Sequence, residues 1–163
     1  MKQLVLSQNK LFETELNIET ELIKIINSNY SNLRTNIQKC KDLVVIQGGD
    51  EKVNRLAVES KKVDILLSPE INNKRDFLFF RNSGLNQVLC KLANKNKISI
   101  GFNFSDILNS NGKERSKILG RMTQNVKLCK KYKVNMVFSS FAKDKYDLRS
   151  KSILSSFSKI LGF

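Results

Sequence analysis

Four short, almost continuous apolar runs recur along this 163-residue chain, and longer amphipathic stretches separate them. Apolar runs of this length are typical of strands that are covered on both faces, and a regular alternation of strand with helix is typical of βα units. The sequence therefore predicts an α/β fold with a parallel sheet, either open and doubly wound or closed into a barrel. The four runs lie at 43–46, 63–67, 98–102 and 134–138.

The stretches between these runs have the spacing of amphipathic helices, with apolar residues every three or four positions. Asp50 and Ser83 stand where N-caps are expected, because their side-chain oxygens can accept hydrogen bonds from a first helical turn. Residues 3–6 and 11–16 are predicted to form one or two further strands. The predicted helices lie at 22–37, after Asp50, after Ser83, around 119–129 and around 153–160.

Charge is distributed unevenly along the chain. Residues 1–60 carry 8 basic and 8 acidic side chains, whereas residues 61–163 carry 21 basic and 7 acidic ones, so the formal net charge of +14 lies in the second part. A basic excess this one-sided favours a polyanionic partner, and nucleic acid first. The chain has no histidine, which excludes His–metal sites and nucleophiles activated by a histidine base.

The three cysteines, Cys40, Cys90 and Cys129, are far apart, so they form no metal-binding pair in the sequence. An odd number of cysteines without a recognisable secretion signal predicts reduced thiols inside a cell. No apolar run approaches the roughly 20 residues of a membrane-spanning helix. We therefore expect a cytoplasmic protein with no membrane partner.

Two motifs at predicted strand ends have both a functional and a structural interpretation. The glycines of Gly48-Gly49-Asp50-Glu51 could admit a phosphate, but Asp50 would repel it, so a tight turn with an Asp cap is favoured. Asp64 and Glu70 could share Mg²⁺, but no further carboxylate cluster joins them, so turn and backbone partners are favoured.

Residues 77–80, Phe-Leu-Phe-Phe, form an apolar quartet inside a connection, between Lys74-Arg75 and Arg81. One interpretation is an extra strand that packs into the core. The other is an exposed surface that docks a partner protein or stacks bases, with Phe77, Phe79 and Phe80 in the interface.

The helix expected at 113–131 carries seven basic residues and one acid, Glu114. Lys117, Arg121, Gln124 and Lys131 fall on one stripe of this helix. A solvated helix face normally mixes charges of both signs, so the stripe predicts contacts with phosphates.

A series of sequence blocks resembles, in order and spacing, the archaeal-type ribonuclease P protein component 3. The resemblance implies a single domain over residues 1–163, with the TIM-barrel-like fold of the polymerase and histidinol phosphatase class. The chain is shorter at both ends than is usual for that family, so we expect a shortened or incomplete barrel with a free sheet edge. The blocks are Gly48-Gly49-Asp50, Asn54-Arg55-Leu56-Ala57, 63–70, 83–89, Leu92-Ala93, Ala142, 146–149 and Leu161-Gly162-Phe163.

The resemblance implies a protein subunit of ribonuclease P, in which the RNA subunit removes the 5′ leader from precursor tRNA. The chain itself is then expected to be non-catalytic and to bind no metal or cofactor, while Mg²⁺ serves the RNA. The implied partners are the ribonuclease P RNA, a small ribonuclease P protein, other ribonuclease P proteins and, through the holoenzyme, precursor tRNA. Two alternatives stay open: a free-standing RNA-binding module and a TIM-type metal-dependent phosphoesterase.

Four basic residues match basic positions of the family pattern near its RNA-contacting surface, and three of them are arginines, which suit bidentate phosphate contacts. Together with two residues of the basic stripe they make up the predicted RNA-binding set. The set is Arg55, Arg81, Lys97, Arg149, Lys117 and Arg121.

Overall fold

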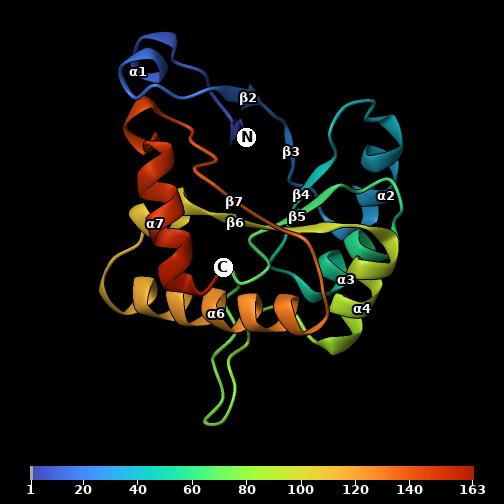
Figure 1. Cartoon of the computed structure of the whole chain (residues 1–163). Coiled ribbons are helices and arrows are strands. Elements are labelled where there is room, and N and C mark those ends of the chain that lie inside the picture. Colours follow the sequence, from blue (N-terminus) through green and yellow to red (C-terminus); the bar gives the residue numbers. More distant parts are fainter. Residues whose placement is uncertain (1) are drawn as a thin grey trace.

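The computed structural model describes residues 2–163 as a ring of parallel strands with helices packed around it (Figure 1). Within the described residues β3 to β7 form one sheet in chain order, and β1 pairs with β2. Every one of these pairs is parallel. The strands are β1 (Gln3–Val5), β2 (Thr20–Leu22), β3 (Ile25–Ile26), β4 (Val45–Gln47), β5 (Ile65–Leu67), β6 (Ser99–Asn103) and β7 (Met136–Ser139).

Backbone hydrogen bonds join the two sheets into a closed ring. On one side the β1–β2 ladder continues towards β3, because the N–H of Ile23 donates to the carbonyl of Val5 at 2.9 Å. On the other side the chain beyond β7 meets β1, where the N–H of Phe141 donates to Leu4 at 3.0 Å and that of Leu6 to Ala142 at 2.9 Å. The TIM-barrel-like expectation is confirmed, and the expected free sheet edge is wrong, because β1 occupies the position between β2 and β7.

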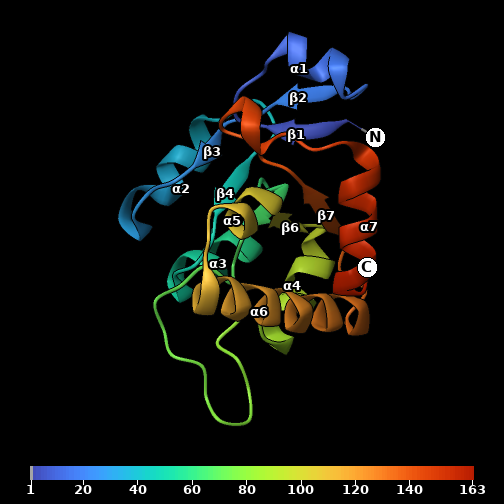
Figure 2. The same cartoon turned by 90° about the vertical axis from the view of Figure 1, so that its left-hand side faces the viewer.

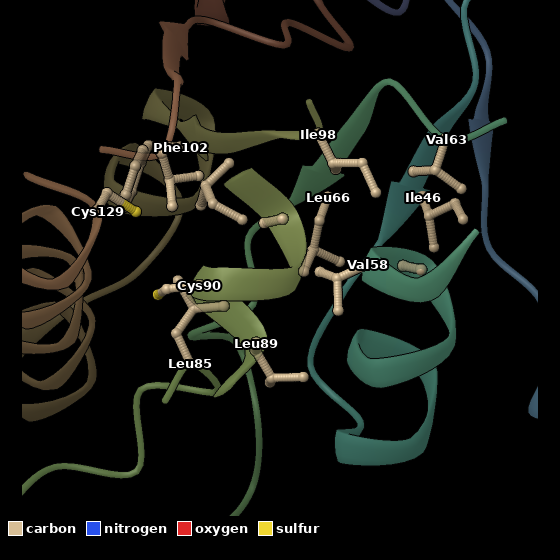
Figure 3. Close-up of a cluster of buried hydrophobic side chains, with 14 of the residues drawn as sticks. Ile46, Val58, Val63, Leu66, Leu85, Leu89, Cys90, Ile98, Phe102 and Cys129 are labelled. Atoms are coloured by element: carbon tan, nitrogen blue, oxygen red, sulfur yellow. The ribbon is translucent and has the colours of Figure 1, made fainter. Parts of the chain in front are cut away.

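Alternate side chains of the strands face into and out of the barrel. Val45, Ile65 and Leu67 belong to a small buried cluster with Ile23 and Phe141, which fills the interior of the ring. The residues between them point the other way, into the larger core under the helices. Figure 3 shows part of that core, in which the labelled side chains of the strands meet those of α3 and α4.

The helices surround the ring on its outer face. In Figure 1, α2, α3 and α4 lie along one side, α6 runs below, and α7 lies on the other side, while α1 sits apart at the top (Figures 1 and 2). In the part of the chain that the structure describes, no helix is long and apolar enough to cross a membrane. The helices are α1 (Lys10–Glu15), α2 (Tyr30–Lys39), α3 (Glu51–Glu59), α4 (Gln87–Asn96), α5 (Phe104–Leu108), α6 (Gly112–Lys131), the 3-10 helix η1 (Lys145–Asp147) and α7 (Lys151–Leu161).

The four apolar runs form β4 to β7 as predicted, but the structure corrects several boundaries. Residues 11–16 belong mostly to the helix α1, not to a strand, because Asn9 caps that helix by accepting from the N–H of Phe12. The helix predicted at 22–37 begins only at Tyr30, and β3 occupies part of its first half. The N-cap of α4 is Asn86, whose Oδ1 accepts from the N–H of Leu89, whereas Ser83 lies in the preceding loop.

Candidate nucleic-acid interface

A long loop, residues 72–82, leaves the barrel between β5 and α4 and projects beyond α6 as the green segment in Figures 1 and 2. At its tip the N–H of Phe77 donates to the carbonyl of Phe80 at 2.9 Å. The rings of the same two residues stack with their centroids 4.5 Å apart. We call residues 77–80 the tip and the remaining residues of this loop its base.

Arg121 of α6 holds the base in place. Its guanidinium donates to the carboxylate of Asp76 at 2.8 Å and to the backbone carbonyls of Asn72 at 3.0 Å and Lys74 at 2.6 Å. It also donates to the carbonyl of Glu70 at 2.9 Å, just before the loop begins. Arg121 is only 1% exposed, so the prediction that it contacts RNA is wrong: the loop backbone and Asp76 occupy the guanidinium.

Two further residues of the predicted stripe also bind the loop. The side-chain amide of Gln124 accepts from the N–H of Arg81 at 3.2 Å and donates to its carbonyl at 3.0 Å. Nζ of Lys117 donates to the carbonyl of Lys74 at 2.8 Å. The polar stripe of α6 is therefore a clamp for a loop that has few backbone partners of its own.

Asp76 completes the clamp from the loop side. Its Oδ1 accepts from the N–H of Asn82 at 2.9 Å, across the base. Burial opposes the charge of Asp76, but hydrogen bonds from Arg121 and from the backbone of Asn82 outweigh that effect and lower its pKa. The guanidinium of Arg81 approaches the same carboxylate at 3.7 Å and covers Gly120 of α6.

A buried carboxyl lies beneath the clamp. Glu70 is fully buried, and its Oε2 accepts from Nδ2 of Asn125 at 3.1 Å. Burial raises the pKa of Glu70 to about 8, against the smaller influence of these partners and of Arg121. Among residues 2–163, Oε1 of Glu70 and Oδ1 of Asn125 are both buried without a hydrogen-bond partner. Burial thus favours the protonated form of Glu70, which carries a donor of its own.

The tip itself is exposed. Leu78 and Phe79 are 89% and 92% accessible, and Phe77 and Phe80 are 59% and 57% accessible. The interpretation of residues 77–80 as a core strand is therefore wrong. A role of Phe77, Phe79 and Phe80 in a partner interface stays a prediction.

Beside the loop, α4 and α6 form a basic surface. The two helices together carry nine basic residues and one acid, Glu114. They are joined at one end, where Nδ2 of Asn94 donates to the carbonyl of Tyr132 at 2.7 Å. We call this region the α4–α6 basic surface. Its exposed lysines on the two helices are Lys91, Lys95, Lys113, Lys127, Lys130 and Lys131.

Lys91 and Lys95 did not emerge from the sequence as functional residues. The signal was present, since α4 carries no acidic residue in its ten positions. Only the fold shows that this helix packs next to α6, where the same excess occurs. The surface therefore gathers lysines from two segments that are well separated in the sequence.

The other predicted RNA-binding residues lie elsewhere. Arg55 is on the outer face of α3 and pairs with Glu59 at 2.8 Å. Lys97 ends α4 and precedes β6, at the amino ends of the strands. Arg149 follows β7, beyond the carboxyl ends, and donates to the carbonyls of Tyr146 and Leu148 at 2.6 Å. The contact of these three residues with RNA stays a prediction.

The turn after β4 has the structural role that was favoured. The carboxylate of Asp50 accepts from the N–H groups of Lys52 and Val53, both at 3.2 Å, and so caps α3. Gly49 adopts a φ of 123°, and a Cβ there would come 2.2 Å from the carbonyl oxygen of Ile71. This position therefore requires glycine because the chain that enters the loop passes close to it.

Asp64 and Glu70 lie at opposite ends of β5. The carboxylate of Asp64 accepts from the N–H of Val44 at 2.8 Å, at the start of the strands, whereas Glu70 is buried after their ends. They cannot share a metal ion in this arrangement. Residues 2–163 contain no group of three or more His, Cys, Asp or Glu side chains placed to hold a metal.

Comparisons with known proteins agree with this architecture. The model of the family described as RNase P subunit p30 matches residues 21–163. The chain belongs to this family. The resemblance read from the sequence blocks is thereby confirmed.

Two archaeal relatives, both described as ribonuclease P protein component 3, illustrate the similarity. The protein of Methanococcus maripaludis strain C6 is 36% identical over 138 residues, which cover 83% of this chain and 56% of the relative. That of Methanosarcina acetivorans is 36% identical over 143 residues, which cover 86% and 56%. The chain thus spans little more than half the length of these relatives.

A solved structure shares the fold. A chain in the cryo-EM structure of archaeal ribonuclease P with mature tRNA aligns with a TM-score of 0.71 at 29% identity. The alignment covers 99% of this chain and 72% of that chain. The described barrel is therefore the greater part of a fold that occurs in an assembled ribonuclease P.

Proposed function

We propose that this chain is a protein subunit of ribonuclease P that binds the catalytic RNA and supports removal of the 5′ leader from precursor tRNA. Its membership of the p30 family is the observation that carries the proposal. The charge of the α4–α6 basic surface agrees with it, because exposed lysines with a single acid among them gain free energy from contact with phosphates.

In this proposal the RNA performs the chemistry with Mg²⁺, and the chain contributes binding and shape. The chain offers no histidine that could act as a general acid or base. We assign the protein to the cytoplasm, because a reducing compartment keeps thiols such as those of Cys40, Cys90 and Cys129 free. Precursor tRNA is expected to meet the chain only within the holoenzyme.

The tip of the 72–82 loop is proposed to contact the small ribonuclease P protein. A solvated loop rarely carries four adjacent large apolar side chains, because their exposure costs free energy that burial in an interface recovers. Aromatic residues beside arginine are typical anchors of such interfaces. The clamp on α6 supports this role, since a tip on a fixed base loses less conformational entropy on binding.

Co-purification tests the proposal. An affinity-tagged form of the chain, expressed in the cells from which the sequence comes, is isolated at moderate salt, and the bound RNA and proteins are identified. The expected result is one abundant structured RNA, together with a small basic protein, in a fraction that cleaves precursor tRNA when Mg²⁺ is added. The purified chain alone is expected not to cleave. Isolation without RNA, or processing by the RNA-free chain, would contradict the proposal.

A further inference from the structure

An open pocket of about 650 Å³ lies where the first turns of α2 and α3 meet the beginning of the 72–82 loop. Its position beyond the carboxyl ends of β3 and β4 is where ligands commonly bind in parallel α/β folds. Ile71 and Val53 supply apolar wall, and Tyr30 supplies an aromatic ring that is 47% exposed. The polar lining is dominated by side-chain amides, namely Asn27, Asn29, Gln47, Asn72 and Asn73.

The charged groups around this pocket are already paired. The carboxylate of Asp50 is occupied by the first N–H groups of α3. Nζ of Lys74 and the carboxylate of Glu51 form an ion pair at 2.8 Å. An anion would therefore meet an unneutralised aspartate and a lysine already paired, and a metal ion would find a single carboxylate already used as a cap. The lining fits an uncharged ligand with several donors and acceptors.

The amides differ in how much of their hydrogen-bonding capacity is used. Asn72 is committed to the loop, because it donates to the carbonyl of Asn82 at 2.9 Å and accepts from the N–H of Lys74 at 3.0 Å. Asn29 occupies the N-cap position of α2, yet its side chain makes no capping hydrogen bond. Asn27 and Asn73 are exposed at the rim. One wall is thus fixed, while amides on the opposite wall and the rim can face a ligand.

We propose that this pocket receives one unstacked nucleobase of a single-stranded RNA segment. A planar heterocycle matches the apolar walls, and the ring of Tyr30 can stack on its face. Each side-chain amide presents a donor beside an acceptor, so it can form two hydrogen bonds with the edge of a base. The inference deepens the proposed function and rests on it in one respect, since RNA contact is what brings a base to the pocket.

A neighbouring hollow of about 270 Å³ extends the path. It shares Gly49, Asn72 and Lys74 with the pocket and continues to Phe80 and Arg81. A strand whose base enters the pocket can therefore continue through this hollow towards Arg81 and α6. The amide-lined pocket and this continuous path together suit a nucleotide within a chain better than a free anion.

The test uses the full chain and four neutral nucleosides, adenosine, guanosine, cytidine and uridine, with binding followed by ligand-observed NMR. Because these nucleosides are uncharged, the general attraction of anions to a chain with a net charge of +14 does not contribute to their binding. At least one nucleoside is expected to bind saturably. Tyr30→Ala and Asn73→Ala are each expected to weaken that binding by about fivefold or more, the scale of removing one stacking or base-edge interaction. Tyr146→Ala, which removes an exposed tyrosine of η1, is the matched control and is expected to leave binding unchanged.

The inference is overturned if no nucleoside binds saturably, if Tyr146→Ala weakens binding as much as Tyr30→Ala, or if ribose 5-phosphate competes as well as the nucleoside. A phosphate competitor would identify an anion site and not a base pocket. The result is separable from the proposed function. Absence of nucleoside binding with RNA still co-purified removes only the pocket, whereas nucleoside binding without co-purified RNA removes the ribonuclease P proposal.

Discussion

At the base of the 72–82 loop a charged side chain is buried, and at its tip an apolar side chain is exposed, which is the reverse of the usual distribution. At the base an arginine is 1% exposed, and at the tip a phenylalanine is 92% exposed. The arginine tolerates burial because Asp76 and three backbone carbonyls satisfy its donors. The phenylalanine has no such compensation within the described residues. The contrast teaches that α6 fixes the base of the loop while the apolar tip remains exposed to solvent.

The largest expected effect comes from breaking the base. Arg121→Ala removes the partner of Asp76 and leaves three carbonyls without their donor, so we expect a loss of roughly 3–5 kcal/mol in the free energy of unfolding. Urea denaturation followed by circular dichroism measures this loss. Lys113→Ala, at an exposed position in the first turn of the same helix, is the control and is expected to cost far less. Equal stability of both variants would show that the clamp does not hold the loop.

Breaking the tip is expected to change binding and not stability. In the double variant Leu78→Ser, Phe79→Ser both side chains are almost fully exposed, so unfolding should shift by no more than about 0.5 kcal/mol. Affinity for the small ribonuclease P protein should fall at least about tenfold, because central apolar anchors contribute most to an interface. Isothermal titration with that protein gives the affinity.

The matched control for the tip is Leu11→Ser, which alters an exposed leucine of α1 at the far end of the molecule (Figure 1). It is expected to bind the partner like the unmodified chain. If the control weakens binding as strongly as the tip variant, or if the tip variant unfolds, the tip is not a docking surface.

The carboxyl of Glu70, which lies beneath the base, makes the free energy of unfolding depend on pH. Because burial raises the pKa of Glu70 from 4.5 to about 8, the folded chain retains a proton that the unfolded chain releases at lower pH. The free energy of unfolding should therefore fall as the pH rises from about 4.5 to 8, by on the order of 1 kcal/mol per pH unit from this group.

Glu70→Gln removes that contribution. Asp106, whose pKa burial also raises, contributes a slope of the same sign in both proteins. The variant should gain stability relative to the unmodified chain as the pH is raised from about 5 to 8 in urea titrations. A constant difference across this range would mean that Glu70 is ionised in the folded state.

Much of the fold follows from local sequence, and the corrections have physical causes. Continuous apolar runs predicted β4 to β7 because burial on both faces leaves a clear pattern. The strand predicted at 11–16 is wrong because α1, a six-residue helix without a buried side chain, carries no helical periodicity. Closure of the ring could not be predicted, since it depends on β1 meeting the end of β7, 135 residues away.

The site was predicted less well than the fold. The stripe on α6 was identified, but its partner was not, because a basic residue facing phosphate and one facing backbone carbonyls look alike in sequence. Glu70 was considered only as a metal ligand beside Asp64. Its contact with Asn125 could not be predicted, since only the fold brings residues 55 positions apart together. The exposure of residues 77–80 was one of two interpretations, and their apolar character alone could not choose between them.

The most direct measurement tests whether the exposed face of α6 binds RNA. The salt dependence of affinity for the RNA that co-purifies with the chain is measured for Lys127→Ala, Lys130→Ala, Lys131→Ala combined in one protein. These three lysines are exposed, so the variant should remain as stable as the unmodified chain. We predict that the slope of log K against log salt concentration becomes shallower by about 2–3 units, close to one for each phosphate that the variant no longer neutralises. An unchanged slope and affinity would contradict the assignment of the α4–α6 basic surface to RNA.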